Sequence, residues 1–367
     1  MSLVITHTEI FKLAIAMEPF VIATEVSTVA QNTFIRIHTS DGTVGMGECS
    51  AFPMLTGETL ATCFEVGKDL AGILIGKNPL EIDARLADLD AYIARNATIK
   101  SAFDMALHDI AAKQAGLPLY QFLGGKRKRI VTDLTIGIDE PAKMAASATA
   151  FVARGVKTIK VKLGKDFTSD VERIRLIREA VGPDIALRAD ANQGWDPTTA
   201  LEVLKAIAPY GIEFCEQPMH HRYDAQLPAL RTASPIKIMA DESVCDHHDA
   251  IRVISAGGCD YVNIKLAKSG GIREAIRIAD SAQALQTPCM IGGMLESRLA
   301  LTAKVHLALS HANIIFYDLD TCLLGQLEDP VVGGAEYHGF ELQVSDGPGL
   351  NADIHPEFLS RCASAIV

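Results

Sequence analysis

The chain has 367 residues, of which 49% are hydrophobic and 22% charged, a composition typical of a soluble globular protein with one large domain and a smaller one. Its formal net charge of −11 argues against nucleic acid and anionic membranes as partners. The first residues have no signal-peptide pattern, and nowhere do about 18 apolar residues run together. We therefore expect a cytoplasmic protein.

The first third of the chain predicts a small α+β domain. Residues 3–15 and 33–38 are strand-like, and the turn Ser40-Asp41-Gly42 leads into a further strand at 44–48. The clearest helix is expected at 99–114, where apolar residues recur on one face before a glycine. This segment is interpreted as a module that accompanies a larger domain.

From residue 130 onward, strand-like runs alternate with helical stretches. Eight runs are candidate strands: 131–138, 156–163, 185–189, 212–215, 236–240, 261–264, 288–291 and 314–320. One strand and one returning helix take about 25 residues, the unit of a closed β/α barrel. We predict an α+β domain at 1–128, a β/α barrel at 129–325, and a segment at 326–367 that folds back onto the first domain.

Charged residues end five consecutive strands of this repeat. Lys162, Asp190, Glu216, Asp241 and Lys265 are separated by 28, 26, 25 and 24 residues, and each closes a short apolar run. In a β/α barrel these positions lie at the carboxyl ends of the strands, which is the face that carries the chemistry. Three carboxylates flanked by two lysines are therefore expected at one mouth.

The three carboxylates suggest a metal site. Asp190, Glu216 and Asp241 offer hard oxygen ligands on adjacent strands, which suits a divalent cation, and Mg²⁺ is the expected ion. An alternative is that each acid caps the helix that follows it. The occurrence of three in consecutive strands favours the metal.

Two lysines on one strand suggest a base. Lys160 and Lys162 are two residues apart, so both point toward the barrel interior. Like charge and desolvation are expected to lower the pKa of a lysine there, so that it acts as a base near neutral pH. Lys265 lies on the opposite strand, and two bases on opposite sides of a carbon acid are the minimum for racemisation or epimerisation. A structural ion cluster is the alternative.

Several motifs carry a family resemblance. The runs Thr158-Ile159-Lys160-Val161-Lys162, Asn263-Ile264-Lys265 and Gly292-Gly293-Met294-Leu295-Glu296-Ser297, together with the three carboxylate runs, resemble the muconate-lactonizing-enzyme subgroup of the enolase superfamily. The resemblance implies a modified TIM barrel of the (β/α)7β type, whose α+β capping domain is completed by the C-terminal segment. It also implies one Mg²⁺ per subunit, a Lys base and an enediolate intermediate, with Lys160 adding positive charge.

The substrate class follows from the same resemblance. Asp318-Leu319-Asp320 resembles the Asp-x-Asp motif with which dipeptide epimerases of the L-Ala-D/L-Glu type hold the substrate's α-ammonium group, and Thr135 is similar to a substrate-contacting residue. The two carboxylates are expected to share a face of the last barrel strand. The expected function is Mg²⁺-dependent epimerisation of a dipeptide at its C-terminal residue, with Lys162 and Lys265 as acid and base, in a homo-oligomer.

One position departs from the family pattern. Glu25 aligns with a basic residue that family members acting on Ala-Glu carry in a mobile loop of the capping domain. An acid there would repel a substrate carboxylate and favour a cationic or neutral side chain. The side-chain specificity therefore stays open between Ala-Glu and a cationic or hydrophobic dipeptide.

Two other functions are compatible with parts of the pattern. N-succinylamino acid racemases and o-succinylbenzoate synthases share the catalytic residues but lack the pair Asp318 and Asp320. A non-catalytic binding or structural barrel is the alternative from another class. That reading expects a lost ligand or base, and none is missing here.

Overall fold

Eight parallel strands form the central sheet of the computed structural model, which describes residues 3–367. Their spatial order is β12-β11-β10-β9-β8-β7-β6-β5, and their bounds are β5 (Leu134–Ile136), β6 (Thr158–Lys162), β7 (Ala186–Asp190), β8 (Ile212–Glu216), β9 (Lys237–Ala240), β10 (Tyr261–Ile264), β11 (Cys289–Gly292) and β12 (Ile314–Asp318). The first and last strands approach each other, because the Asp133 backbone N–H donates to Tyr317 O at 3.2 Å. The sheet is a nearly closed barrel, as the sequence predicts.

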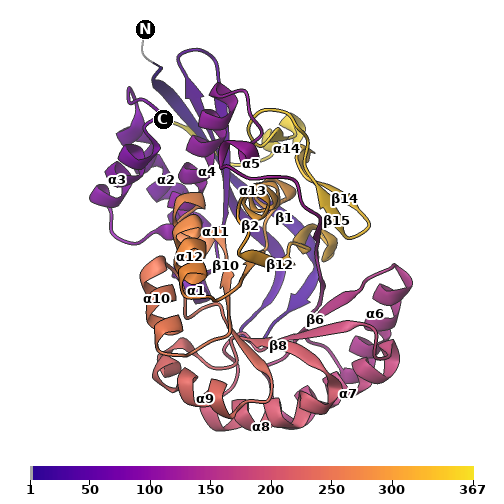
Figure 1. The fold of residues 1–367 in the computed structure, drawn as a ribbon. Helices are drawn as coiled ribbons and strands as arrows, with labels where there is room; N and C mark the ends of the chain where they lie inside the picture. Colours follow the sequence, from indigo (N-terminus) through magenta and orange to yellow (C-terminus); the bar gives the residue numbers. More distant parts are fainter. Residues whose placement is uncertain (1–2) are drawn as a thin grey trace.

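Seven helices return the chain between these strands and cover the outside of the barrel (Figure 1). They are α6 (Pro141–Ala153), α7 (Phe167–Val181), α8 (Pro197–Ile207), α9 (Leu227–Ala233), α10 (His247–Ser255), α12 (Ile272–Ala284) and α13 (Arg298–Ser310), with a short α11 (Leu266–Ser269) after β10. Asp166, Asp196 and Asp246 cap three of them at their N-termini. Strand β12 is followed by a 3₁₀ turn, η3 (Thr321–Leu323), so the architecture is (β/α)7β.

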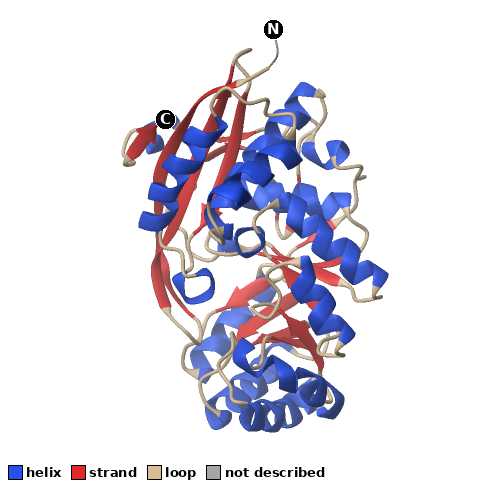
Figure 2. Ribbon diagram, turned by 90° about the vertical axis from the view of Figure 1, so that its left-hand side faces the viewer, coloured by secondary structure: helices blue, strands red, loops and turns tan. Residues whose placement is uncertain are grey.

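The capping domain consists of an antiparallel sheet with helices packed on it (Figure 2). Its elements are β1 (Ile5–Val21), β2 (Val26–Thr39), β3 (Val44–Ser50), α1 (Pro53–Thr56), α2 (Leu60–Leu74), α3 (Ile82–Tyr92), α4 (Ala97–Gln114) and α5 (Leu119–Phe122). The β1–β2 hairpin is longer than the sequence predicts, since Pro19 interrupts the pattern on which a strand is expected. Its tip meets the barrel, where the Ile138 N–H donates to Val21 O and Lys165 Nζ to Ala23 O.

The C-terminal segment returns to the capping domain, as expected. Its strands are β13 (Val331–Gly333), β14 (Glu336–His338), β15 (Glu341–Gln343), β16 (Ala352–Ile354) and β17 (Ser364–Ile366), with α14 (Pro356–Leu359) before the last. Strand β17 adds to the edge of β1 in antiparallel register, with Glu9 opposite Ile366. Strand β15 pairs with β4 (Ile130–Val131), so the segment also touches the start of the barrel.

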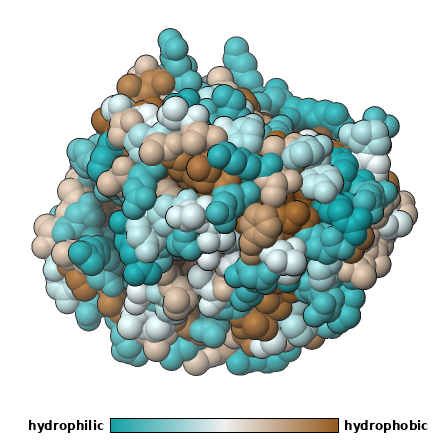
Figure 3. Space-filling model, turned by 90° about the horizontal axis from the view of Figure 1, so that it is seen from below, coloured by the Kyte–Doolittle hydropathy of each residue, from teal (hydrophilic) through white to brown (hydrophobic). Residues whose placement is uncertain are grey.

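The outer surface is mixed in character. The underside of the barrel in Figure 3 is mainly hydrophilic, with separate hydrophobic patches. Exposed apolar residues of the barrel helices include Phe167 on α7 and Ile251 on α10. Within residues 3–367, no helix combines the length and hydropathy needed to cross a membrane.

Candidate active site

A cavity of about 350 Å³ lies where the carboxyl ends of the barrel strands face the capping domain. The barrel contributes Thr135, Lys162, Asn192, Lys265, Gly293, Met294, Leu295, Asp318, Asp320, Thr321 and Leu324; the capping domain contributes Phe20, Ile22, Glu25, Val26, Ser27, Thr28, Val29, Gln31, Ser50, Ala51, Phe52 and Pro53. Most of the residues predicted from the strand ends therefore meet at or just below one cavity. A volume of this size is at the small end of ligand pockets.

The two predicted acid/base lysines lie on opposite sides of this cavity. Lys162 ends β6, the second barrel strand, and Lys265 follows β10, the sixth. Lys162 Nζ donates to Asp190 Oδ2 at 2.6 Å and to Asn192 Oδ1 at 3.0 Å. Lys265 Nζ is 2.8 Å from Asp241 Oδ2. Each amine thus contacts one of the predicted metal ligands while it faces the cavity.

The three predicted metal ligands are fully buried below the cavity. Asp190 and Glu216 are register partners on β7 and β8, and Asp241 follows β9. Burial raises the pKa of Asp190, but Lys162 and Lys160 outweigh it and bring the pKa to about 2. Burial and the neighbouring Asp190 raise the pKa of Glu216 to about 7. The neighbouring lysines therefore compensate the negative charge of these three carboxylates only in part.

Lys160 lies at the centre of this charge cluster. Its ammonium is 3.0 Å from Asp190 Oδ2, 2.7 Å from Glu216 Oε2 and 2.7 Å from Asp318 Oδ2. Burial lowers the pKa of Lys160, but these carboxylates outweigh it and raise the pKa well above its ordinary value. The pKa of Lys265 is raised in the same way by Asp241 and Glu216. The lowering of the pKa that was expected for a lysine on this strand is therefore not seen at Lys160, because its amine contacts three carboxylates.

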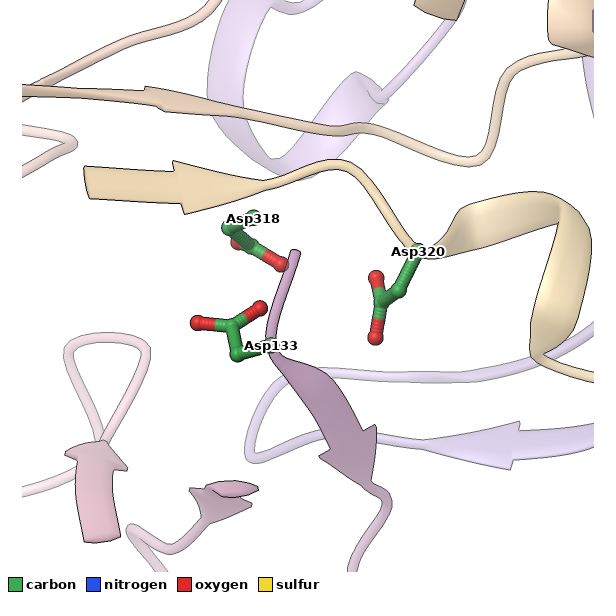
Figure 4. A group of neighbouring side chains, drawn as sticks. All are labelled: Asp133, Asp318 and Asp320. Atoms are coloured by element: carbon green, nitrogen blue, oxygen red, sulfur yellow. The ribbon is translucent and has the colours of Figure 1, made fainter. Parts of the chain in front are cut away.

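Asp133, Asp318 and Asp320 form a second group of carboxylates (Figure 4), which Lys160 links to the first. Oxygen atoms of Asp133, Asp318 and Asp320 lie within 4.8 Å of one another. Asp320 Oδ2 accepts from the Thr135 backbone N–H at 2.6 Å, and Asp133 Oδ2 accepts from Arg188 Nη1 at 2.8 Å. Burial and the neighbouring Asp318 raise the pKa of Asp320 to about 7. This group carries excess negative charge and suits a cationic partner.

The sequence analysis placed both Asp318 and Asp320 on the last strand, and this detail is wrong for Asp320. Strand β12 ends at Asp318, and Asp320 begins the 3₁₀ turn η3. The two carboxylates nevertheless lie on the same side of the chain, both near Asp133 (Figure 4). Both still line the cavity.

The chemistry of the first carboxylate group fits a divalent cation, because Asp190, Glu216 and Asp241 offer hard oxygen ligands from three neighbouring strands. Glu216 Oε2 and Asp241 Oδ2 are buried, and each contacts a lysine ammonium group, that of Lys160 at 2.7 Å and that of Lys265 at 2.8 Å. Buried anionic oxygens of this kind are costly unless a cation contacts them. In residues 3–367, the oxygens of Asp190, Glu216 and Asp241 do not cluster as tightly as those of Asp133, Asp318 and Asp320. The reason is that Lys160 and Lys265 lie against the first set.

Four polar residues of the site were missed by the sequence analysis. Lys268 Nζ donates to Asp241 Oδ1 at 2.6 Å, and Asn263 Nδ2 donates to Glu216 Oε1 at 2.7 Å. Glu242 is buried beside Asp241, and burial and Asp241 raise its pKa to about 8. The fourth is Asp133. Lys268 follows Lys265 by three residues, which is one helical turn and was the available signal.

Glu25 also lines the cavity. It lies in the short connection between β1 and β2, and its Oε1 accepts from Ser27 Oγ at 2.5 Å. It is the only ionisable side chain that the described part of the capping domain contributes to the lining. The capping-domain wall around it combines apolar side chains, such as Phe20 and Ile22, with uncharged polar ones, such as Ser27 and Gln31.

Comparisons with known proteins agree with this architecture. A family model described as enolase C-terminal domain-like matches residues 143–358, and one described as the N-terminal domain of mandelate racemase / muconate lactonizing enzyme matches residues 5–124. The chain belongs to the enolase superfamily, in its muconate-lactonizing-enzyme subgroup. The first matched region covers most of the barrel and of the C-terminal segment, and the second covers the capping domain.

Individual relatives cover nearly the whole chain. A D-Ala-D/L-Ala epimerase of Cytophaga hutchinsonii is 46% identical over 361 residues, which are 98% of each chain. A hydrophobic dipeptide epimerase of Enterococcus faecalis is 39% identical over 335 residues, which are 91% of this chain and 94% of that one. The crystal structure of the Cytophaga hutchinsonii dipeptide epimerase with Mg and D-Ala-L-Val superposes with a TM-score of 0.98 over 99% of this chain and 100% of that one.

Proposed function

We propose that this protein is a Mg²⁺-dependent dipeptide epimerase, which inverts the α-carbon of the C-terminal residue by 1,1-proton transfer between two lysines. The observation that carries the proposal is the placement of Lys162 and Lys265 on opposite sides of one cavity. The relatives named as dipeptide epimerases support it, since they match the chain from end to end.

In this proposal each lysine serves one face of the substrate. The neutral amine of one lysine takes the α-proton, the substrate becomes an enediolate, and the ammonium of the other lysine gives a proton to the opposite face. Because carboxylates raise the pKa of Lys265, its ammonium form is ready to act as the donor. Lys160 adds a permanent positive charge near the substrate carboxylate.

Asp190, Glu216 and Asp241 would hold one Mg²⁺ per subunit. The three buried carboxylates on neighbouring strands support this assignment, as does the Mg complex of the Cytophaga hutchinsonii enzyme. When bound, the ion supplies positive charge to the carboxylate oxygens on which the enediolate charge accumulates. Lys162 favours the ionised form of Asp190, and Lys265 and Lys268 favour that of Asp241.

Asp318 and Asp320 would bind the α-ammonium group of the dipeptide. Both line the cavity, and Asp133 behind them adds a third carboxylate with its Oδ1 buried and unpartnered among the described residues. Thr135 would contact the substrate from the first barrel strand, where its backbone N–H holds Asp320. A charge-assisted contact of this kind selects a free amine over an acylated one.

The side chain of the C-terminal residue would be uncharged and mostly apolar. Phe20, Ile22 and Phe52 face the cavity from the capping domain, and Glu25 is the charged group among them. A distal carboxylate would meet Glu25 and no unengaged cation. The relatives named for D-Ala-D/L-Ala and for hydrophobic dipeptides are consistent with this choice.

Exchange of the α-hydrogen in deuterated water, followed by NMR with and without Mg²⁺, tests the proposal. We expect exchange at the C-terminal residue of Ala-Ala and Ala-Val only when Mg²⁺ is present, and about tenfold slower exchange for Ala-Glu than for its neutral isostere Ala-Gln. Absence of exchange with every dipeptide would contradict the function. A strong preference for Ala-Glu would show instead that Glu25 does not face the substrate.

Replacement of Asp320 separates the proposal from the N-succinylamino acid racemase alternative. We expect Asp320→Asn to lower kcat/KM for dipeptides by about 100-fold, because one charge-assisted contact to the α-ammonium is lost. An N-succinyl amino acid has no such ammonium, and any turnover of it should be unaffected. The measurement is kcat/KM for both substrates, and the reverse pattern would favour the racemase.

A further inference from the structure

The loop between β11 and α13 forms one wall of the cavity. Gly293, Met294 and Leu295 line it from this loop. Two side chains from the segment after β12 hold the loop, since Thr321 Oγ1 donates to Met294 O at 2.7 Å and Gln326 Nε2 donates to Glu296 O at 2.7 Å. Beneath it, Glu296 Oε2 accepts from the Met294 N–H, and its other oxygen pairs with the buried Lys304.

The capping domain reaches the same loop through Glu48. This residue lies on β3, is 1% exposed, and accepts from Ser297 N at 2.8 Å, from Ser297 Oγ at 2.5 Å and from Ala300 N at 3.0 Å. Ser297 is the N-cap of α13, so a carboxylate from one domain completes the N-terminus of a helix in the other. Ser50, two residues along β3, donates to Leu295 O at 3.3 Å.

Strand β3 is a rigid support for this contact. Gly45 and Gly47 lie directly against α4, where a Cβ at either position would collide with the carbonyl oxygens of Ala106 and Ala102. The strand also pairs along its length with β2. The backbone of Glu48 is therefore fixed by its packing. If the loop moved, Glu48 could not move with it and the hydrogen bonds between them would break.

We propose that Glu48 is a positioning residue, which fixes the wall formed by residues 293–297 and so sets how closely the cavity fits its substrate. The proposal rests on the proposed function only in taking this cavity as the dipeptide site. Glu48 does not itself touch the cavity. Its effect passes through Ser297 to Leu295 and Met294.

Glu48→Gln tests this with Asp109→Asn as the matched control. Asp109 is also a buried carboxylate that contacts β3, accepting from Met46 N at 2.9 Å and from Leu350 N at 2.7 Å, but its contacts lead to the C-terminal segment and not to the loop. We expect Glu48→Gln to raise KM for Ala-Val about tenfold with kcat changed by less than about threefold. Hydrogen exchange of residues 293–300 should accelerate. Asp109→Asn should leave KM and this exchange unchanged.

Ser297→Ala is the second variant, because it removes the side-chain part of the same contact from the barrel side. We expect the double variant to have the KM of Glu48→Gln alone, since both changes act on one interaction. Unchanged hydrogen exchange at residues 293–300 in both single variants would overturn the proposal, as would an equal rise in KM for Asp109→Asn. Hydrogen exchange needs no substrate, so it decides the role of Glu48 even if no dipeptide is turned over.

Discussion

Replacing Lys162 or Lys265 by alanine is expected to lower kcat for dipeptide epimerisation about 10⁴-fold, the size of effect expected when a general acid or base is lost. Inversion needs both amines, because the proton leaves one face of the α-carbon and returns to the other. Chiral chromatography of the products measures the loss. The exposed Lys157, which precedes β6, provides a control: Lys157→Ala should keep the wild-type rate.

The two lysine variants should also differ from each other. Each keeps one base, so each should still exchange the α-hydrogen of the single epimer whose proton faces that base, without inverting it. NMR in deuterated water with each pure epimer measures this. Inversion by either variant at the wild-type rate would contradict a two-lysine mechanism and direct attention to another base.

Replacing Asp241 by asparagine is expected to abolish Mg²⁺ binding and to lower kcat by about 10³-fold. Asp241 is also held between Lys265 and Lys268, both of which are buried, so its loss leaves two cations without their partner. Breaking a buried ion pair costs about 3–5 kcal/mol. The measurement is the rise in Tm on addition of Mg²⁺, which the wild type should show and Asp241→Asn should not.

The pH dependence of stability provides a second measurement on Asp241. Burial raises its pKa, but Lys265 and Lys268 outweigh it and hold the pKa well below its ordinary value. Its contribution to stability is therefore present above the ordinary pKa and is lost as the pH falls through the lowered one. As the pH falls into the acid range, Tm should decrease less steeply for Asp241→Asn than for the wild type. Asp260, which bridges Arg231 and Lys237 away from the cavity, is the control, and Asp260→Asn should retain the Mg²⁺ effect.

Most of the predictions about the barrel came from the spacing of its strands along the sequence. A repeat of about 25 residues that ends in charged side chains locates Lys162, Asp190, Glu216, Asp241 and Lys265, because parallel strands bring their carboxyl ends to one edge. The structure brings both lysines to the cavity and buries the carboxylates beneath it. The roles of these residues remain proposals.

Contacts between distant segments were not predictable in the same way. Asp133 joins the site only because β5 and β12 meet where the barrel closes, and no local pattern marks it. The raised pKa of Lys160 depends on which carboxylates face it, and this requires the three-dimensional arrangement. The contact of Glu48 with Ser297 spans 249 residues. The full length of the β1–β2 hairpin was not predicted, because Pro19 interrupts the strand pattern in the sequence.

The pairing of β17 with β1 has a consequence for the order in which the protein folds. The edge of the first strand is completed by residues 364–366, which leave the ribosome long after β1. During synthesis the barrel repeats can associate with their neighbours as they emerge, while β1 keeps one edge open to other chains. Closure of the sheet above the cavity is therefore a late event, and a chain stopped before β17 would expose that edge to aggregation.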